Sequence, residues 1–259
     1  MEPMTIREIM DAVGGKLLGE FGDINRMVGR VETDSRTIHA GSLFVPLVGE
    51  RFDGHAYINA ALEGGAAGCF TQRERESYLP GKFYIKVDST QRALRDLAKY
   101  YKKKFPIPVV ALTGSVGKTT TKDMVAAVLG EKYRVLKTEG NLNNEIGVPM
   151  TLLRLSGEHE IAVLELGMNH AGEIDYLSAL VEPDVVLMTN IGDSHIEHFG
   201  SREKILEAKS EIFHHVKSGA FVVINGDDPL LNTLPGKLPY AFNRVGAGEG
   251  LDYRAERLV

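Results

Sequence analysis

The stretch most suited to carry chemistry is ALTGSVGKTTTK. Gly114 and Gly117 are followed by Lys118 and Thr119, the order in which phosphate-binding loops arrange these residue types. In such loops the lysine neutralises phosphate and the threonine hydroxyl binds Mg²⁺. Leu112 stands where the usual loop has its first glycine, so a shorter, variant loop is expected. The alternative is an ordinary glycine-containing turn, which leaves the Lys-Thr-Thr run unexplained.

Two more candidates follow apolar runs further along the chain. Glu165 ends the run IAVLE, where a carboxylate is costly unless a cation pairs with it. It is therefore either half of a structural ion pair or a Mg²⁺ ligand beside Thr119. His195 lies in the loop after DVVLMTN, and its neutral imidazole can ligate a metal. An isolated loop histidine is more often solvated, so both interpretations stay open.

Lys209 falls in the apolar stripe of a predicted helix, with Ile205, Ile212 and Val216 at helical spacing. Ordinarily such a lysine extends its amine to the edge of the stripe. If the amine is buried instead, its pKa falls, and the neutral amine can add CO₂ to give a carbamate. A carbamate is anionic and can bridge metal ions. Periodicity alone does not decide between these two states.

Polar clusters are candidates for substrate binding. The segment GNLNNEIGVP contains Asn141, Asn143 and Asn144, which either build turns or hydrogen-bond a polar ligand. Near the N-terminus, TDSRT contains Ser35 and Arg36. Taken alone this is a polar turn, although the arginine fork is well suited to a diphosphate.

Strands and helices must position these residues. The apolar runs FYIKV, IPVVALT, RVLKT, IAVLELG, DVVLMTN and AFVVIN predict buried strands that alternate with helices. One such helix is predicted over residues 119–132, with Met124, Val125, Val128 and Leu129 on one face. This alternation predicts a parallel sheet covered by helices on both faces. Ligands bind beyond the carboxyl ends of the strands of such sheets.

Length and composition bound the class of protein. The chain has 259 residues, and the Pro-Gly turn in YLPGK predicts a small α/β domain over 1–82 and a larger one over 83–259. A net charge of −5 gives no reason to expect nucleic acid or an anionic membrane as a partner. We see no signal peptide and no run of ~20 apolar residues that would insert into a membrane. The single cysteine, Cys69, fits a reducing compartment, so a cytoplasmic location is expected.

The residues of several motifs resemble those of the Mur ligase superfamily, whose ATP loop also lacks the first glycine. They are TGSVGKTTTK, GNLNNEIGVP, ELGMNHAGEI, TNIGDSHIEHFGS and AKSEIF. The resemblance is greatest to the member that joins D-alanyl-D-alanine to UDP-N-acetylmuramoyl-tripeptide through an acyl phosphate. It implies a P-loop-type central domain, an N-terminal UDP-sugar domain, ATP as a substrate and two Mg²⁺ ions. A monomer is expected.

The resemblance also implies roles for single residues. ATP phosphates would be bound by Gly114, Ser115, Val116, Gly117, Lys118, Thr119 and Thr120. One Mg²⁺ would bind Thr119 and Glu165, and the second would bind His195 and a carbamylated Lys209. Lys118, His195 and Lys209 are the expected catalytic residues. The match places Ser35, Arg36, Phe52, Asp53, Gly54 and His55 near the uridine diphosphate, and Asn141, Asn143 and Asn144 are the other candidates for substrate contacts.

Members of the superfamily continue into a third, Rossmann-like domain that binds the D-alanyl-D-alanine acceptor. Nothing in these 259 residues resembles that domain, so the central domain is expected to be incomplete and the acceptor domain to be missing. Two other functions therefore stay open beside the ligase. The chain as it stands would be a module that binds the UDP substrate and nucleotide without ligation. The other alternative is a P-loop ATPase of another family, which would need no sugar-nucleotide domain.

Overall fold

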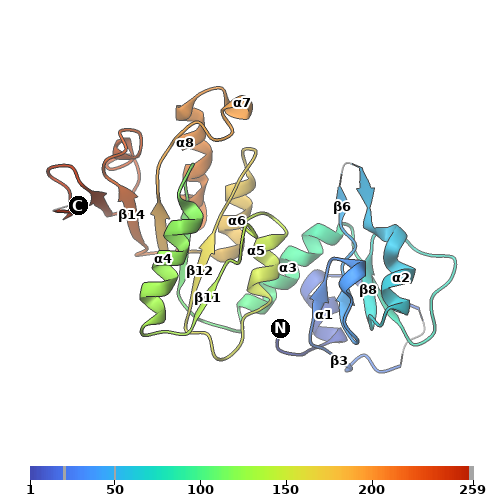
Figure 1. The fold of residues 1–259 in the computed structure, drawn as a ribbon. Coiled ribbons are helices and arrows are strands. Elements are labelled where there is room, and N and C mark those ends of the chain that lie inside the picture. Colours follow the sequence, from blue (N-terminus) through green and yellow to red (C-terminus); the bar gives the residue numbers. More distant parts are fainter. Residues whose placement is uncertain (20–21, 50, 257–259) are drawn as a thin grey trace. The chain divides into compact units, whose positions relative to one another are not determined.

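The computed structural model describes residues 1–19, 22–49 and 51–256 (Figure 1). By their internal contacts these residues form two compact units. Unit 1 comprises Met1–Phe105 with Leu152–Ser156, and unit 2 comprises Pro106–Thr151 with Gly157–Val259. None of the helices in the described ranges is long and apolar enough to cross a membrane.

Unit 1 is a small α/β unit. Its strands are β1 (Met4–Thr5), β2 (Lys16–Leu18), β3 (Met27–Val28), β4 (Val31–Glu32), β5 (Leu43–Phe44), β6 (Val48–Gly49), β7 (Phe52–Asp53), β8 (Gly68–Thr71) and β9 (Phe83–Lys86). Its helices are α1 (Ile6–Val13), α2 (Ile58–Glu63) and α3 (Thr90–Lys102), with the short 3₁₀ helices η1 (Ser35–Thr37) and η2 (Gly54–Tyr57). The main sheet has the order β2-β9-β8-β5-β4, while β1–β3 and β6–β7 form separate antiparallel pairs.

Local sequence signals set the ends of the unit 1 helices. The Thr5 hydroxyl accepts a hydrogen bond from the Glu8 N–H (3.1 Å), and the Glu8 carboxylate accepts one from the Thr5 N–H (2.9 Å). This reciprocal capping box begins α1. Gly14 ends it in the left-handed conformation, at φ 58°. Cys69 is fully buried in a core cluster with Phe44 and Tyr84, and burial raises the pKa of its thiol, so it is a small core residue.

The division between the units lies later in the chain than the sequence pattern predicted. The run FYIKV forms β9, which pairs with β8 in parallel and with β2 in antiparallel orientation, so it belongs to unit 1. The Pro-Gly turn before it is a turn inside unit 1, and the division by contacts falls at Phe105 and Pro106 rather than after Lys82. The reason is that an apolar strand pattern shows that a strand is buried but not which sheet it joins.

Unit 2 contains the predicted parallel sheet. Its strands are β10 (Val109–Thr113), β11 (Val135–Lys137), β12 (Ile161–Glu165), β13 (Val185–Met188), β14 (Phe221–Asn225), β15 (Phe242–Gly246) and β16 (Tyr253–Arg254). Its helices are α4 (Lys118–Gly130), α5 (Gly147–Leu152), α6 (Glu173–Val181), α7 (Ile196–Phe199) and α8 (Arg202–Ser210), with η3 (Glu211–His215) and η4 (Leu231–Thr233). The seven strands are all parallel, in the order β11-β12-β10-β13-β14-β15-β16.

The direction of the crossovers reverses about β10. From β10 the chain crosses through α4 to β11, and from β12 it crosses back through α6 to β13 on the other side of β10. Because such crossovers are right-handed, α4 covers one face of the sheet while α6 and α8 cover the other, as Figure 1 shows. The carboxyl end of β10 is therefore the position at which open α/β sheets bind ligands.

The helix α4 differs from the sequence prediction in which residues it buries. Val125 and Leu129 pack against a core cluster that contains Val110 on β10. Met124 and Val128 are 65% and 73% exposed, although all four were predicted on one face. Residues four apart lie above one another on a helix, so 124 and 128 form one row and 125 and 129 the next. Only the second row faces the sheet.

Candidate functional site

The phosphate-binding loop lies at the carboxyl end of β10. The strand ends at Thr113 and α4 begins at Lys118, so the loop is the four residues between them. Gly114 has φ 152°, and a Cβ at this position would collide with the Thr189 side chain, so a glycine is required. Gly117, at φ 77°, directly precedes α4. The N–H groups of the first helical residues have no partners inside the helix, and a helix N-terminus favours an anion.

Residues that follow β13 hold this loop in place. The Ser115 N–H donates to the Asn190 carbonyl (2.9 Å), and the Val116 N–H donates to Asn190 Oδ1 (3.0 Å). Thr189 donates its hydroxyl to the Val116 carbonyl (2.8 Å). The N–H groups of residues 115 and 116 are thus engaged with Asn190, which leaves the start of α4 as the anion-facing part. Asn190 was not among the predicted site residues, although its place at the end of the predicted strand run DVVLMTN was an available signal.

Lys118 is folded back over the loop. Its amine donates to the Gly114 carbonyl (2.9 Å) and to the Ser115 carbonyl (3.2 Å). Burial lowers the pKa of this amine, and the negative charge of Glu165 offsets part of the shift. The lysine therefore lies within the loop, close enough to Glu165 for the two charges to interact.

Glu165 connects the ends of three segments of unit 2. Its side chain is buried, with 1% exposure. Thr119 donates its hydroxyl to Oε2 (3.0 Å), and Asn143 donates its amide to Oε1 (2.7 Å). The Glu165 N–H donates to the Thr138 hydroxyl (3.0 Å), which ties β12 to the end of β11. The structure therefore brings together Thr119, Glu165 and Asn143, which the sequence places far apart.

Lys209 is buried rather than extended to the edge of its helix. It is 1% exposed, and Ile205 and Ile212 in the same stripe are fully buried. Burial, with a smaller contribution from the positive charge of Lys118, lowers the pKa of Lys209 to about 7. A substantial fraction of the amine is therefore neutral at neutral pH, which is the state that can add CO₂. Lys118 and Lys209 lie within range of each other's charge.

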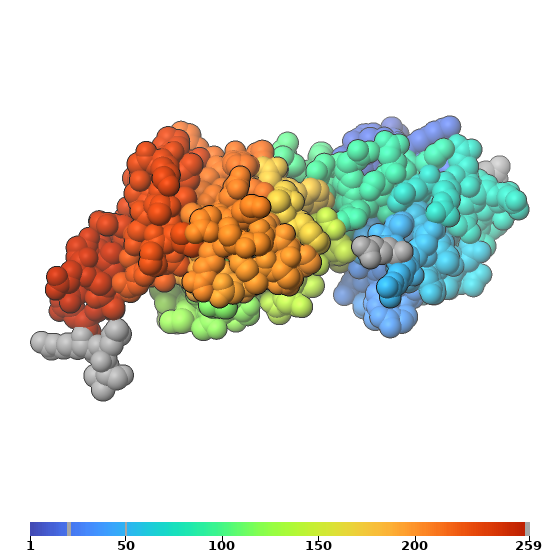
Figure 2. All heavy atoms as spheres, turned by 90° about the horizontal axis from the view of Figure 1, so that it is seen from above, coloured from blue at the N-terminus to red at the C-terminus, as the bar shows by residue number. Residues whose placement is uncertain are grey.

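His195 belongs to the same electrostatic cluster. Burial and then the positive charge of Lys209 lower its pKa, with a smaller effect from Lys118. The neutral ring is the form that ligates metals. His195 also has φ 66°, a left-handed conformation that is uncommon for residues other than glycine. Figure 2 shows the segment around α7, in orange, at the surface of unit 2.

Two oxygen donors beside the phosphate-binding loop are of the kind that binds Mg²⁺. The Thr119 hydroxyl and the Glu165 carboxylate are 3.0 Å apart, and both are the oxygen ligands that this ion prefers. Within the described ranges, no group of three or more His, Cys, Asp or Glu side chains could hold a metal ion. Mg²⁺ is often bound by only one or two side chains together with phosphate. Lys209 as an amine supplies no ligand oxygen, whereas its carbamate would.

The asparagine cluster divides between two tasks. Asn143 donates to Glu165, as described above. Asn144 Oδ1 accepts a hydrogen bond from the Gly147 N–H (2.8 Å) at the start of α5, so it caps this helix. Asn141 is exposed, and its carbonyl accepts from the Asn143 N–H (2.7 Å). The turn-building alternative therefore describes Asn144, while Asn143 faces the site.

Unit 1 contains a separate pocket of about 370 Å³. Phe52 and Tyr57 form one side of it, with stacked rings whose centroids are 5.5 Å apart. Ser35, Arg36 and Asp34 also line it. The Arg36 fork binds the Asp34 carboxylate, with Nε 2.9 Å from Oδ1 and Nη2 2.6 Å from Oδ2. Arg36 thereby lowers the pKa of Asp34 to about 2.

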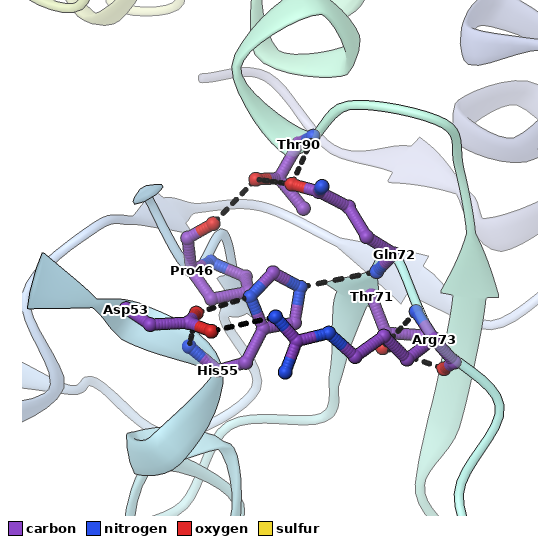
Figure 3. A network of polar contacts seen from close by, with 7 residues as sticks. All are labelled: Pro46, Asp53, His55, Thr71, Gln72, Arg73 and Thr90. Carbon is purple, nitrogen blue, oxygen red and sulfur yellow. Dashed lines mark hydrogen bonds and ion pairs between the residues drawn. The ribbon is translucent and has the colours of Figure 1, made fainter. Parts of the chain in front are cut away.

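Four of the six residues predicted near the uridine diphosphate line this pocket. They are Ser35, Arg36, Phe52 and Gly54. The other two, Asp53 and His55, are hydrogen-bonded to each other (2.7 Å) and to the end of β8 (Figure 3). Asp34 and Tyr57 line the pocket without having been predicted. The aromatic Tyr57, three residues after the predicted DG pair, was the available signal for that side.

Comparisons with known proteins agree with this geometry. Residues 112–257 match the Mur ligase middle domain, and residues 28–102 match the Mur ligase family, catalytic domain. Over 227 residues the chain is 46% identical to the UDP-N-acetylmuramoyl-tripeptide--D-alanyl-D-alanine ligase of Bacillus subtilis (strain 168), which covers 88% of this chain and 50% of that relative. The chain spans about half the length of the curated relatives it matches.

Solved structures are similar over both units. A crystal structure of MurF from Acinetobacter baumannii has a TM-score of 0.88 and 36% identity, and the match covers 97% of this chain and 55% of that chain. The MurF ligase of Thermotoga maritima, solved in complex with ADP, has a TM-score of 0.79 and 37% identity, over 86% of this chain and 51% of that chain.

Proposed function

Because the chain belongs to the Mur ligase family, we propose that it forms the substrate-binding part of an ATP-dependent amide ligase. The ligase joins D-alanyl-D-alanine to UDP-N-acetylmuramoyl-tripeptide in the cytoplasm during peptidoglycan precursor synthesis. The observation that carries the proposal is the convergence of Thr119, Glu165 and Lys118 at the carboxyl end of β10, the switch point of the sheet. The names of the similar enzymes support the choice of substrates.

The proposed reaction has two steps. A terminal carboxylate oxygen of the tripeptide attacks the γ-phosphorus of ATP, the bond from that phosphorus to the β–γ bridging oxygen breaks, and ADP leaves. The amine of D-alanyl-D-alanine then attacks the acyl carbon, the bond to phosphate breaks, and the nitrogen loses a proton. Both steps gather negative charge where carboxylate and phosphate meet, so positive and hydrogen-bonding groups fixed there lower the barrier.

We assign these groups as follows. Lys118 and the N–H groups at the start of α4 bind the phosphates of ATP. Thr119 and Glu165 would hold one Mg²⁺, which neutralises phosphate charge when bound. His195 and Lys209 would hold a second, provided that Lys209 and CO₂ form a carbamate with loss of one proton. Asn143 orients the Glu165 carboxylate through its 2.7 Å hydrogen bond.

We assign the unit 1 pocket to the uridine diphosphate part of the substrate. The stacked rings of Phe52 and Tyr57 offer an apolar face to the nucleobase. Arg36, which is 87% exposed, offers a fork that matches two phosphate oxygens once it leaves Asp34. The aromatic and cationic groups thus lie in one pocket, as a nucleoside diphosphate requires.

Isothermal titration of the 259-residue chain tests this function. We expect separate binding of ADP with Mg²⁺ and of UDP-N-acetylmuramoyl-tripeptide, each unaffected by a variant in the other site. A P-loop ATPase of another family would bind ADP and give no heat with the UDP-tripeptide, which would refute the proposal. Phosphate release with all three substrates then distinguishes a ligase from a binding module, since only a ligase releases phosphate in proportion to added D-alanyl-D-alanine.

A further inference from the structure

One wall of the unit 1 pocket consists of two exposed aromatic rings on short elements. Phe52 lies on the two-residue strand β7, and Tyr57 ends the 3₁₀ helix η2. The rings are 53% and 44% exposed, so burial in a core does not hold them in place. What fixes this wall must therefore lie in the residues between them.

His55 lies between these rings in the sequence and is buried, with 8% exposure. Its Nδ1 is 2.7 Å from Asp53 Oδ1, and its Nε2 is 3.0 Å from the Gln72 backbone nitrogen (Figure 3). A backbone N–H can only donate, so Nε2 accepts and carries no proton. The single proton of the neutral ring is then on Nδ1 and is donated to Asp53. Both ring nitrogens are used, and neither is left to bind a ligand.

The network continues from His55 to two other segments of unit 1. Gln72 Oε1 accepts a hydrogen bond from the Thr90 N–H (3.3 Å) at the start of α3. The Thr90 hydroxyl, which is buried, donates to the Pro46 carbonyl (2.5 Å) ahead of β6. Arg73 donates to the second oxygen of Asp53 (2.8 Å). The β6–β7 hairpin, the end of β8 and the start of α3 are therefore joined in one network, in which the imidazole ring connects Asp53 to the Gln72 backbone.

The opposite side of the same segment is fixed by the backbone. The Gly54 N–H donates to the Leu47 carbonyl (2.8 Å), and a Cβ on Gly54 would lie 2.7 Å from that oxygen. Residues 53–55 are thus held between the Leu47 backbone on one side and Gln72 on the other. Phe52 and Tyr57 flank this fixed stretch.

We propose that His55 is a positioning residue of the pocket. Its neutral ring, protonated on Nδ1, holds Asp53 against the end of β8 and does not contact the ligand. The proposal rests on the proposed function of the pocket as the site for a uridine diphosphate. It differs from the sequence expectation, in which His55 itself lay beside the uridine diphosphate. A residue in this role fixes the wall formed by Phe52 and Tyr57, so its loss weakens the binding of the nucleoside as much as that of the diphosphate. A histidine that touched phosphate would affect the diphosphate alone.

The test compares uridine with UDP in the 259-residue chain, by NMR titration. His55→Ala should weaken the binding of both by the same factor, about tenfold for two lost hydrogen bonds. ADP binding should not change. His55→Asn places an amide donor near the position of Nδ1, and His55→Gln places an acceptor near that of Nε2, so each should restore part of the loss. A loss confined to UDP, or no recovery in either amide variant, overturns the proposal.

The matched control is His39→Ala, which removes another imidazole from the same unit. His39 pairs with Glu32 (2.8 Å) but neither lines the pocket nor joins the network, so we expect unchanged binding. If the wild type binds neither uridine nor UDP, the proposed function of the pocket is refuted. The role of His55 can still be tested then, because amide hydrogen exchange needs no ligand. Amide hydrogen exchange at residues 52–57 should accelerate in His55→Ala and return towards wild type in the amide variants. Unchanged exchange in His55→Ala refutes the positioning role of His55, whichever ligand the pocket binds.

Discussion

The two candidate sites place their charges differently. In unit 2, Lys209 and Glu165 are each 1% exposed, and Lys118 is half-buried, with its amine bonded to a carbonyl of its own loop. In unit 1, Arg36 and Asp34 form a fork-shaped pair whose side chains are 87% and 39% exposed. Burying a charge is costly, whereas an exposed ion pair changes stability little. The buried charges of the unit 2 site therefore lower the stability of the ligand-free protein, whereas the exposed ion pair of the unit 1 site changes it little.

The comparison suggests what each site can do. Two amines with lowered pKa values lie within range of each other's charge, and one of them, Lys118, also interacts with the buried Glu165 carboxylate. This arrangement suits a ligand of high negative charge, and perturbed groups of this kind concentrate at reactive centres. Stacked rings beside a solvent-exposed arginine are arranged to recognise a nucleotide without reacting with it. Unit 2 thus has the properties of a reaction site, and unit 1 those of a holding site.

The largest effect is expected from the buried charge of Lys209. Its pKa is about 7 in the folded protein against 10.5 as the reference value, so below pH 7 the protonated amine is buried at full cost. Stability rises with pH between these two values, because the unfolded chain then binds more protons. Lys209→Met should therefore stabilise unit 2 most below pH 7. Its advantage should shrink towards pH 10.5, by at most about 1.4 kcal/mol per pH unit.

Amide hydrogen exchange without divalent cations measures this effect in each unit separately. Lys204→Met is the matched control, because Lys204 lies on the same helix and is exposed. We expect no pH-dependent gain in the control and none in unit 1. An equal gain at every pH in Lys209→Met would show that its amine is not penalised by burial.

The second effect concerns nucleotide affinity. Lys118→Ala should weaken ADP binding by about 10- to 100-fold, since hydrogen bonds to charged groups contribute about 1.5–3 kcal/mol. UDP binding should not change. Lys132→Ala, an exposed lysine after the far end of α4, should leave ADP binding as it is. Titration calorimetry measures both ligands, and a parallel loss of UDP binding would mean that the two sites are not separate.

These contrasts also explain how much the sequence could show. The strand β10, its loop and α4 are contiguous, so one motif predicted the strand, the turn and the helix start. The other parallel strands of the sheet were readable from apolar runs as far as β14. The strands β15 and β16 lack such a run, because FNRVG alternates with polar residues and YR is too short. The parallel sheet is thus largely visible in the sequence, except at its last two strands.

Side-chain partners that lie far apart in the chain were not predictable. Asn190 holds the phosphate loop from 74 residues away, and Thr90 reaches Pro46 across 44 residues. No local pattern marks such hydrogen bonds, because the neighbours of each partner in the sequence do not indicate which distant residue it contacts. Lys209 illustrates the same limit. Its spacing left burial and exposure equally open, and only the packing of α8 decided between them.

A third, smaller effect separates the two ligands of the unit 1 pocket. Arg36→Ala should weaken UDP binding by about tenfold through loss of one charge-assisted fork, and should leave uridine binding unchanged. Arg36→Lys should recover little, because an ammonium does not reproduce the fork. A loss shared by uridine and UDP would place Arg36 beside the nucleobase instead of the diphosphate. NMR titration of both ligands distinguishes these outcomes.

The smallest effect is expected from the partner of that arginine. Asp34 holds the Arg36 fork at 2.6 and 2.9 Å, so its carboxylate competes with phosphate for the same donors. Asp34→Asn removes the charge but keeps an oxygen to accept the Arg36 N–H, which Asp34 Oδ1 binds at 2.9 Å in the wild type. Since exposed pairs contribute at most about 1 kcal/mol, UDP should bind up to about fivefold more tightly, with the gain shrinking as salt is added. Weaker UDP binding in Asp34→Asn would show instead that the carboxylate itself contacts the ligand, and that the unit 1 site uses its acidic group as directly as unit 2 uses Glu165.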